Sequence, residues 1–413
     1  MDKFVNDKID RKLSFYVIFF FIVQALNGTI KNILPFLTDN LQSKISIIFG
    51  ILLLILMGRG FKYIITRSGS MLLISYGAFI ALYTIGILQS LIRADPVDLL
   101  IGYSALWTFV WWIPMGLFVY SIRDISILYK TLLKGSYLLA GILLLNILPI
   151  LFGIDRLFGD GKEYNMFLSY MLVFPLLLHL NEYLYKNSTL LLMIISVELL
   201  VIVLYGSRGT LLCLFSFIGL KILFSCKNPV KTFLMLLLGL FLSLVFLSFS
   251  SHLVQFLAEY GIESRTLAKL SAGEAFLQGR SNIWTAAINL IEQRPFFGYG
   301  LGGEFYQMTY EAYALSGGYY DEVQDLTPHQ GFLQLMLNFG VIIGSIVGVY
   351  LLGSILKLKY SVNYQTEGLI MVIYSVFVIP AMTISDGIFT KPGIAIYLYL
   401  IINYRKRCLY EKN

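Results

Sequence analysis

The chain has 413 residues, of which 58% are hydrophobic and only 13% are charged, and its mean hydropathy is +0.77. A soluble domain carries about 25% charged residues, and a chain this apolar has too little polar surface to cover its core in water. The composition therefore excludes cytosolic, secreted and disordered proteins and indicates an integral membrane protein. The net charge is +7, and three cysteines are too few and too scattered to form a disulfide framework.

Windows of about 20 apolar residues identify candidate membrane spans, because a helix must cross about 30 Å of hydrocarbon. The candidate spans are residues 13–30, 41–57, 70–92, 97–120, 135–153, 166–184, 189–205, 210–225, 230–250, 329–355, 368–384 and 392–404. We therefore expect an all-α fold, a polytopic membrane bundle of about twelve transmembrane helices.

The distribution of basic residues predicts the orientation. If the N-terminus is inside, 20 of the 31 lysine and arginine residues fall in cytoplasmic segments, so the positive-inside rule places both termini in the cytoplasm. The one long connection then faces outward. The predicted organisation is an N-terminal transmembrane bundle at 1–250, an extracytoplasmic loop at 251–328, and C-terminal transmembrane helices with a basic cytoplasmic tail at 329–413.

The long loop contains one clear helical pattern, from Ser281 to Arg294. Its apolar residues recur at helical spacing, and they are Ile283, Trp284, Ala287, Ile288 and Ile291. Pro295 ends the pattern, and the glycine-rich stretch 298–303 follows. The pattern predicts an amphipathic helix that lies at the membrane surface.

Two arginines on the predicted outer side are candidates for binding an anion. Arg208 lies in the turn Tyr205–Thr210, where flanking glycines let backbone N–H groups and the guanidinium approach one phosphate or diphosphate. The alternative is an arginine that reaches the interface from a helix end. Arg280 precedes the predicted surface helix and, read with Arg208, suggests a divided anion clamp; alone it would be a solvated loop residue. Arg294 and Lys391 are further candidates.

Two other polar residues stand out against their apolar surroundings. His329 follows Pro328 at the outer mouth of a predicted span, where an imidazole can take a proton near neutral pH; a capping histidine is the alternative. Glu198 lies near the middle of the seventh predicted span, and such a carboxylate needs a partner or stays protonated. We expect a structural partner inside the bundle, with coupling to Arg208 as the alternative. His179 is expected to be incidental.

Missing motifs narrow the chemistry. There is no Asp-x-Asp pair to hold a metal-bound nucleotide sugar, no P-loop for ATP, and no cysteine or histidine spacing that suits zinc. The sequence therefore predicts no metal and no cofactor.

Three stretches, in this order, resemble the O-antigen ligase and Wzy-type polysaccharide polymerase superfamily. They are Ser207–Gly209, then Gly279–Trp284 with Pro295 and Gly298–Gly300 downstream, then Pro328–Leu333 with Gly340. The resemblance in motif covers about residues 205–345, and elsewhere the many-span layout agrees. The family usually has asparagine after the histidine; here Gln330 offers a similar amide at longer reach.

The resemblance implies a metal-independent glycosyltransferase with a GT-C-like fold at the outer face of the bacterial inner membrane. Carried over to this chain, it implies that Arg208 and Arg280 grip the diphosphate of an undecaprenyl-diphosphate-linked glycan. His329 would help to activate the acceptor hydroxyl, next to Gln330. The implied partners are the lipid-linked oligosaccharide donor, the glycan acceptor and membrane lipids, with a chain-length regulator and a flippase as candidate protein partners, and no nucleic acid.

The acceptor separates the members of this superfamily. The isoleucine-, lysine-, asparagine- and tyrosine-rich spans and the acidic, aromatic loop favour a polymerase, which extends a lipid-linked repeat unit. The alternative within the superfamily is an O-antigen ligase, which transfers glycan to lipid A-core. The alternative from another class is a lipid-linked oligosaccharide transporter, which would use polar groups near the membrane midplane, and Glu198 is such a group. A purely structural membrane protein is the third alternative.

Overall fold

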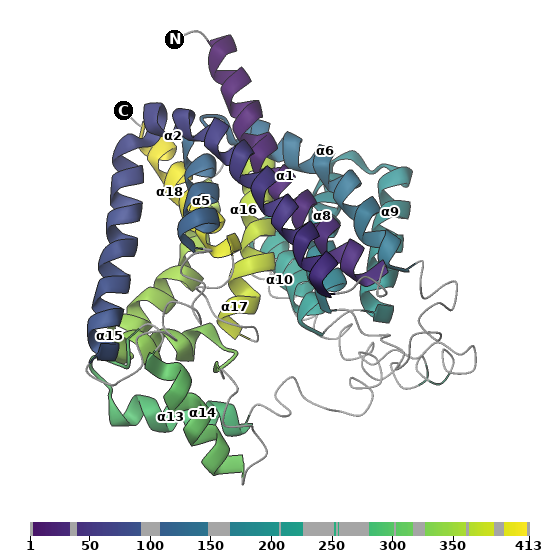
Figure 1. Ribbon diagram of the computed structural model, residues 1–413. Helices are drawn as coiled ribbons and strands as arrows, with labels where there is room; N and C mark the ends of the chain where they lie inside the picture. The colour runs from purple at the N-terminus through teal and green to yellow at the C-terminus, as the bar shows by residue number, and fades with distance from the viewer. Residues whose placement is uncertain are drawn as a thin grey trace. The chain divides into compact units, whose positions relative to one another are not determined.

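The computed structural model describes residues 3–33, 39–91, 108–147, 166–205, 208–225, 252, 255, 281–300, 303–316, 327–360, 363–383 and 392–410 (Figure 1). Every regular element in these ranges is helical. The elements are α1 (Lys3–Ile33), α2 (Asp39–Leu91), η1 (Thr108–Trp112), α5 (Ile113–Ser121), α6 (Ile125–Leu144), η2 (Leu145–Ile147), α8 (Met166–Lys186), α9 (Thr189–Tyr205), α10 (Arg208–Ser225), α13 (Ser281–Gln293), α14 (Gly303–Ser316), α15 (Gly331–Gly353), η4 (Ser354–Tyr360), α16 (Tyr364–Ile373), η5 (Tyr374–Val378), α17 (Ile379–Thr383) and α18 (Pro392–Tyr410).

The structure is that of a polytopic membrane protein. By length and composition, five stretches of the described residues can cross a membrane. They are Phe4–Ile30, Lys44–Leu82, Ile125–Ile147, Gly331–Leu356 and Tyr364–Thr383. Shorter apolar helices cover Thr108–Ser121, Thr189–Leu204 and Gly209–Phe224. The expected span 230–250 lies outside the described residues.

The connection expected at 58–69 is shorter in the structure, because α2 consists of two helices that meet at a kink at Ser68. Non-helical backbone occurs only at Ser68, with φ −145° and ψ 29°. Ser68 Oγ lies 2.7 Å from Ser121 Oγ, and Arg67 Nη1 donates to Ser121 O at 3.1 Å. Polar side chains at the kink are thus bonded to a neighbouring segment, and the backbone on both sides of the kink is helical.

The chain divides into two compact units. Unit 1 comprises Met1–Lys62, Ile122–Ala275 and Ser361–Val376, and unit 2 comprises Tyr63–Ser121, Phe276–Tyr360 and Phe377–Asn413. Helix α2 and the segment that joins α16 to α17 pass from one unit to the other.

Unit 1 is a helical bundle in which α1, α6, α8, α9, α10 and α16 pack together. The buried carboxylate of Asp10 on α1 accepts hydrogen bonds from the backbone N–H groups of Arg123 (3.2 Å) and Asp124 (2.9 Å). The Asp124 side chain in turn accepts from Ser126 N and caps α6. These bonds fix where α6 begins, ten residues before the span expected at 135–153.

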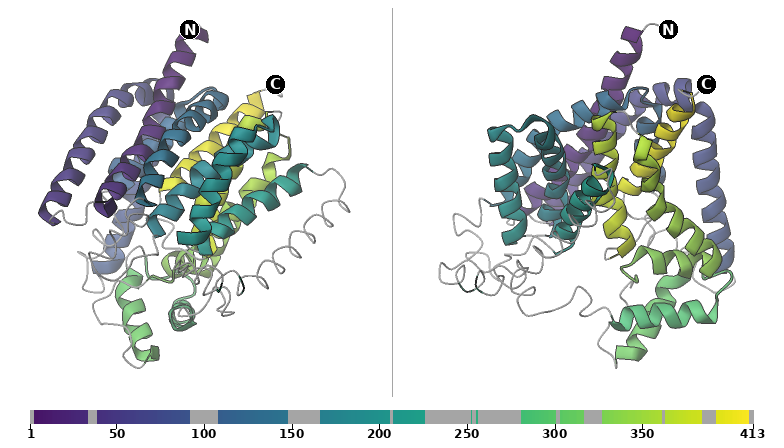
Figure 2. Two further views of the ribbon diagram at one scale, coloured as in Figure 1. Left: turned by 90° about the vertical axis from the view of Figure 1, so that its right-hand side faces the viewer. Right: turned by 180° about the vertical axis from the view of Figure 1, so that it is seen from behind.

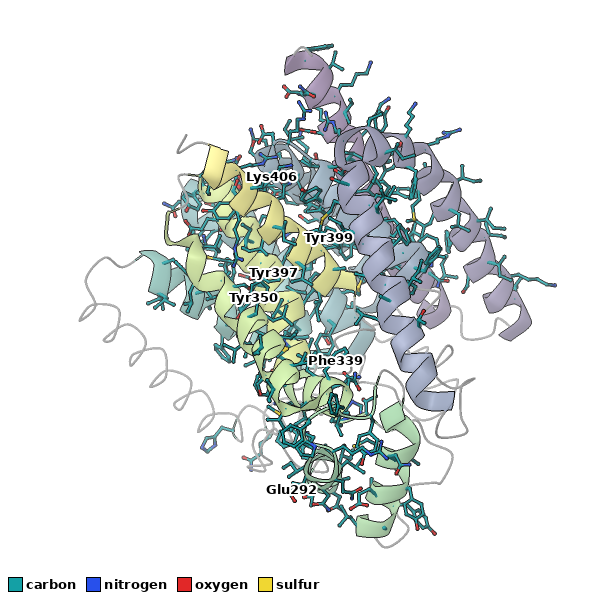
Figure 3. The ribbon with its side chains drawn as sticks, turned by 90° about the vertical axis from the view of Figure 1, so that its left-hand side faces the viewer. Glu292, Phe339, Tyr350, Tyr397, Tyr399 and Lys406 are labelled. Carbon is teal, nitrogen blue, oxygen red and sulfur yellow. The ribbon has the colours of Figure 1, made fainter. Side chains whose placement is uncertain are left out.

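In unit 2, α18 packs on α5 and on the end of α15. Tyr397 OH lies 2.5 Å from Ser354 Oγ, and Arg405 Nη1 donates to Tyr350 OH at 3.0 Å. Figure 3 shows Tyr397, Tyr399 and Lys406 along α18 and Tyr350 on the neighbouring α15. Arg405 and Lys406 are therefore bonded to tyrosine side chains of their own unit, whereas Arg407 donates to Asn403.

Helix α15 is two helices joined at a break, although the sequence predicts one uninterrupted span. Gly340 has φ 78° and ψ 168°, a conformation that only glycine adopts readily. Two carbonyls before the break accept hydrogen bonds from the loop that follows α13: Leu337 O from Tyr299 N (2.6 Å) and Asn338 O from Gly300 N (3.0 Å). The loop thus supplies hydrogen bonds that the interrupted helix lacks.

Beyond the break, the second half of α15 folds against the first. A Cβ at Gly344 would lie 2.6 Å from the Leu335 carbonyl, and one at Gly348 would lie 2.5 Å from the Phe332 ring. Glycines four residues apart let two helices approach closely. The first half, Gly331–Phe339, is therefore a short separate helix held against the second.

Candidate functional site

The turn before α15 holds one of the two described non-glycine residues with positive φ. His329 has φ 47°, in the left-handed region, and its side chain is half-buried. This conformation costs a non-glycine residue about 1–2 kcal/mol. Such strain persists only where the surroundings impose it, and it is found disproportionately at functional sites.

Both neighbours of His329 are held by hydrogen bonds. Trp284 Nε1 on α13 donates to Pro328 O at 2.9 Å. Gln330 is the N-cap of α15, and its Oε1 accepts from Leu333 N at 2.7 Å. The bond from Trp284 joins the turn to α13, and the cap joins it to α15. The imidazole is therefore attached to a backbone that is held on both sides. Sequence reasoning missed this role of Trp284, which it assigned only to the apolar face of its helix.

The predicted helix from Ser281 to Arg294 is confirmed as α13, which ends at Gln293 just before Pro295. Most of its apolar face packs on α14 and on the first half of α15 (Figure 2). The buried residues of this cluster are Ile283, Ala286, Ala287, Leu290, Ile291, Tyr299, Met308, Ala312 and Leu337. Ile288 of the predicted face is exposed. Protein therefore covers most of the face, and the position of α13 relative to the membrane stays a prediction.

The far end of α13 carries a second polar group. The Arg294 guanidinium lies over the Tyr299 ring, 5.0 Å from its centroid, and Tyr299 OH donates to Gln293 Oε1 at 3.2 Å. Burial raises the pKa of Tyr299, against the opposing effect of the nearby Arg294 cation, and Glu311 adds to the rise. Arg294 follows Trp284 by ten residues, or about 15 Å along a helix. It is therefore well separated from the turn at His329.

The arginines expected to bind the donor fall at the edge of the described part of the chain. Arg208 is the first residue of α10 in unit 1, and its side chain lies outside the described atoms. Arg280 directly precedes α13, and Lys391 directly precedes α18; both lie outside the described residues.

Glu198 has its partner inside unit 1. Its carboxylate oxygens lie 3.0 and 3.1 Å from His179 Nδ1, and His179 Nε2 lies 2.8 Å from Ser136 Oγ. All three side chains are fully buried. The sequence led us to expect that His179 is incidental, and this expectation is wrong, because His179 is the buried partner of Glu198. A signal was present: α8 and α9 are joined by residues 187–188 alone, so residues at similar distances from that connection face each other across the two helices.

A partly buried ion pair also lies in unit 1. Lys221 Nζ is 3.7 Å from Glu367 Oε1 and lies over the rings of Tyr185 and Phe217. Among the described residues, no group of three or more histidine, cysteine, aspartate or glutamate side chains could hold a metal ion.

Comparison with known families supplies the deciding observation. Residues 190–348 match the family model described as O-antigen ligase (Wzy_C). This membrane protein carries an O-antigen ligase family domain. No curated protein matches the chain.

The O-antigen ligase domain begins in α9 and ends in the second half of α15. It contains Arg208, Arg280, His329 and the whole hydrogen-bonded assembly of α13, α14 and the broken α15. The family comprises O-antigen ligase- and polymerase-type enzymes of polysaccharide synthesis, so the resemblance noted from short motifs is confirmed over this range.

Proposed function

We propose that this chain is a metal-independent polysaccharide polymerase. It transfers a glycan from undecaprenyl diphosphate to a lipid-linked repeat unit at the outer face of the bacterial inner membrane. In this proposal the chain has about twelve spans in a GT-C-like arrangement, both termini are cytoplasmic, and 251–328 is extracytoplasmic. The observation that carries the proposal is the strained, doubly anchored turn at His329 inside the O-antigen ligase domain.

His329 is proposed to take the proton of the acceptor hydroxyl as that oxygen attacks the donor sugar. A general base contributes most when its pKa lies near the working pH, and imidazole meets this condition. Because Trp284 and Gln330 hold the turn on both sides, the ring is positioned before the substrate arrives. Such preorganisation avoids the cost of ordering a mobile loop during the reaction.

Arg208 and Arg280 are proposed to bind the donor diphosphate, with Arg294 and Lys391 as further candidates. Arg208 begins α10, so the N–H groups of the first helical turn and a guanidinium belong to the same few residues. Negative charge develops on the leaving diphosphate, and fixed cations stabilise it in the transition state. Removing one such contact should cost about 3 kcal/mol, or about 100-fold in rate.

The test uses His329→Asn and His329→Gly in a strain that lacks the chromosomal gene. Both residues tolerate a left-handed backbone, so protein level and membrane insertion should match the wild type. Polymer on a glycan gel should nevertheless be lost. His252→Asn is the matched control, because His252 is exposed and lies before the described part of the loop assembly. Normal polymer in both His329 variants would refute the proposed role.

Arg208 and Arg280 are tested in the same strain by replacement with alanine and with lysine. Lysine keeps the charge but loses the planar fork that binds two phosphate oxygens. We expect no polymer with alanine and partial activity with lysine. Full activity of either alanine variant would remove that arginine from the donor site.

The description of the matching family as O-antigen ligase favours one second candidate, a ligase that transfers finished glycan to lipid A-core. Surface glycan from the deletion strain distinguishes the two. Single repeat units on their final anchor indicate a lost polymerase, whereas long chains left on the carrier lipid indicate a lost ligase. A transporter of lipid-linked oligosaccharide would instead leave the repeat unit on the inner leaflet.

A further inference from the structure

Unit 1 contains three buried polar side chains, bonded in a row, that have no role in the proposed glycosyl transfer. Ser136 on α6, His179 on α8 and Glu198 on α9 are joined by contacts of 2.8 to 3.1 Å, and none of the three side chains is exposed. His179 lies 7 residues before the end of α8, Glu198 lies 9 residues after the start of α9, and Ser136 lies 11 residues after the start of α6. At 1.5 Å per residue, this is about 10–16 Å inside the bundle.

The hydrogen atoms shared by these three side chains can be counted. Ser136 Oγ lies 2.7 Å from Leu133 O and 2.8 Å from His179 Nε2, and its one hydrogen can be donated to only one of them. When Ser136 donates to Leu133 O, it accepts from His179, and Nε2 carries a hydrogen. The 3.0 Å contact between His179 Nδ1 and Glu198 then needs a second hydrogen, held either on the ring or on the carboxyl.

We propose that His179 and Glu198 form a proton-binding site that holds one exchangeable proton inside unit 1. With the proton on the carboxyl the pair is neutral, and with it on the ring the pair is an imidazolium and a carboxylate; in both cases the net charge is zero. Without it, a lone carboxylate would remain in an apolar bundle, which is strongly unfavourable. The ligand of this site is a proton, and the site is independent of the proposed glycan chemistry.

Among the residues that the structure describes, the groups around the pair do not supply a substitute charge. On α6, the Tyr137 ring stacks on His179 with centroids 4.4 Å apart. On α8, Glu182 is already paired with Lys186 at 2.6 Å. On α10 and α16, Lys221 and Glu367 face each other at 3.7 Å. The Glu198 carboxylate itself lies within hydrogen-bond distance of His179 Nδ1.

Glu182 provides a matched control in the same helix. Its carboxylate accepts from Tyr129 OH at 2.8 Å and pairs with the Lys186 ammonium at 2.6 Å. Two donors satisfy it as an anion, so it needs no additional proton. Glu182 and Glu198 are both buried acids of unit 1, and they differ in this requirement.

The test measures how stability depends on pH. Above about pH 6.5 an unfolded chain has neutral histidine and ionised glutamate, whereas the folded pair keeps its proton. The folded state then holds one proton more, so stability falls as pH rises, and the unfolding equilibrium constant increases about tenfold per pH unit from this pair. Denaturant titrations of the full-length protein in detergent micelles at pH 7, 8 and 9 should show this slope.

Glu198→Gln should lower the pH slope by one proton, because the amide can donate to His179 Nδ1 without binding a proton. Glu182→Gln should leave the slope as in the wild type. Equal slopes for the wild type and Glu198→Gln would overturn the proposal, as would equal losses of slope in the two variants.

A second measurement does not depend on the folding of a Glu198 variant. The chain has three histidines, so His252→Asn combined with His329→Asn leaves His179 as the only imidazole for ¹⁵N spectroscopy. We expect a hydrogen on Nε2, as the neutral Nε2–H form or as imidazolium. A neutral ring with hydrogen on Nδ1 alone would mean that Ser136 donates to the ring and Glu198 is an unprotonated acceptor, and would refute the site.

Discussion

The break in α15 gives the sharpest test of how the loop assembly is built. Gly340→Ala places a Cβ against the backbone carbonyl of Phe296 and forces a non-glycine residue into φ 78°, ψ 168°. The backbone strain costs about 2 kcal/mol. The overlap must push the loop after α13 away, which endangers three hydrogen bonds worth about 1 kcal/mol each. They are Tyr299 N to Leu337 O, Gly300 N to Asn338 O and Val341 N to Pro295 O.

The expected loss of stability is therefore about 3–5 kcal/mol, depending on how many of these bonds break. Gly353→Ala is the matched control, because Gly353 lies in the same helix and no atom lies within 4 Å of its added Cβ. Denaturant titration in detergent measures both variants. Gly353→Ala should be neutral or slightly stabilising. A loss below about 1 kcal/mol for Gly340→Ala would refute the break.

Three further predictions concern the same assembly. Trp284→Phe keeps the apolar ring but loses the bond to Pro328 O, so stability should fall by about 1 kcal/mol and polymer formation should fall with it; unchanged polymer would show that this bond does not position the turn. Gln330→Ala removes the N-cap and should cost about 1 kcal/mol in a denaturant titration, whereas Gln330→Asn should restore most of it. Because burial raises the pKa of Tyr299, the neutral phenol contributes stability that is present below pH 10 and lost above it; Tyr299→Phe should abolish that alkaline loss, and an unchanged profile would contradict it.

Periodicity predicted the parts of the fold that depend on local pattern. Helix α13 was found because its apolar residues recur at helical spacing, and its end was found because proline cannot continue a helix. The helical backbone of residues 58–67, up to the kink at Ser68, could not be predicted in this way. Glycines and charged residues there are typical of a connection, and only contacts such as Arg67 to Ser121 O show what they do within a helix.

The break at Gly340 could not be predicted because the apolar run continues through it on both sides. A glycine inside an apolar helix is usually tolerated. What interrupts the helix is a set of hydrogen bonds from residues 295–300, about 40 positions earlier in the chain. The motifs at His329 and Arg208 were visible in the sequence, but the anchoring of the turn by Trp284 requires a contact between residues 44 positions apart.

The energetics of the turn at His329 explain why the assembly around it is so extensively bonded. A left-handed histidine costs about 1–2 kcal/mol, and a single hydrogen bond contributes about 1 kcal/mol. Neither the Trp284 bond nor the Gln330 cap alone would hold the turn securely, whereas the two together offset the strain. Both bonds need a fixed first half of α15, which the break at Gly340 separates from the rest of the helix and the loop after α13 holds in place.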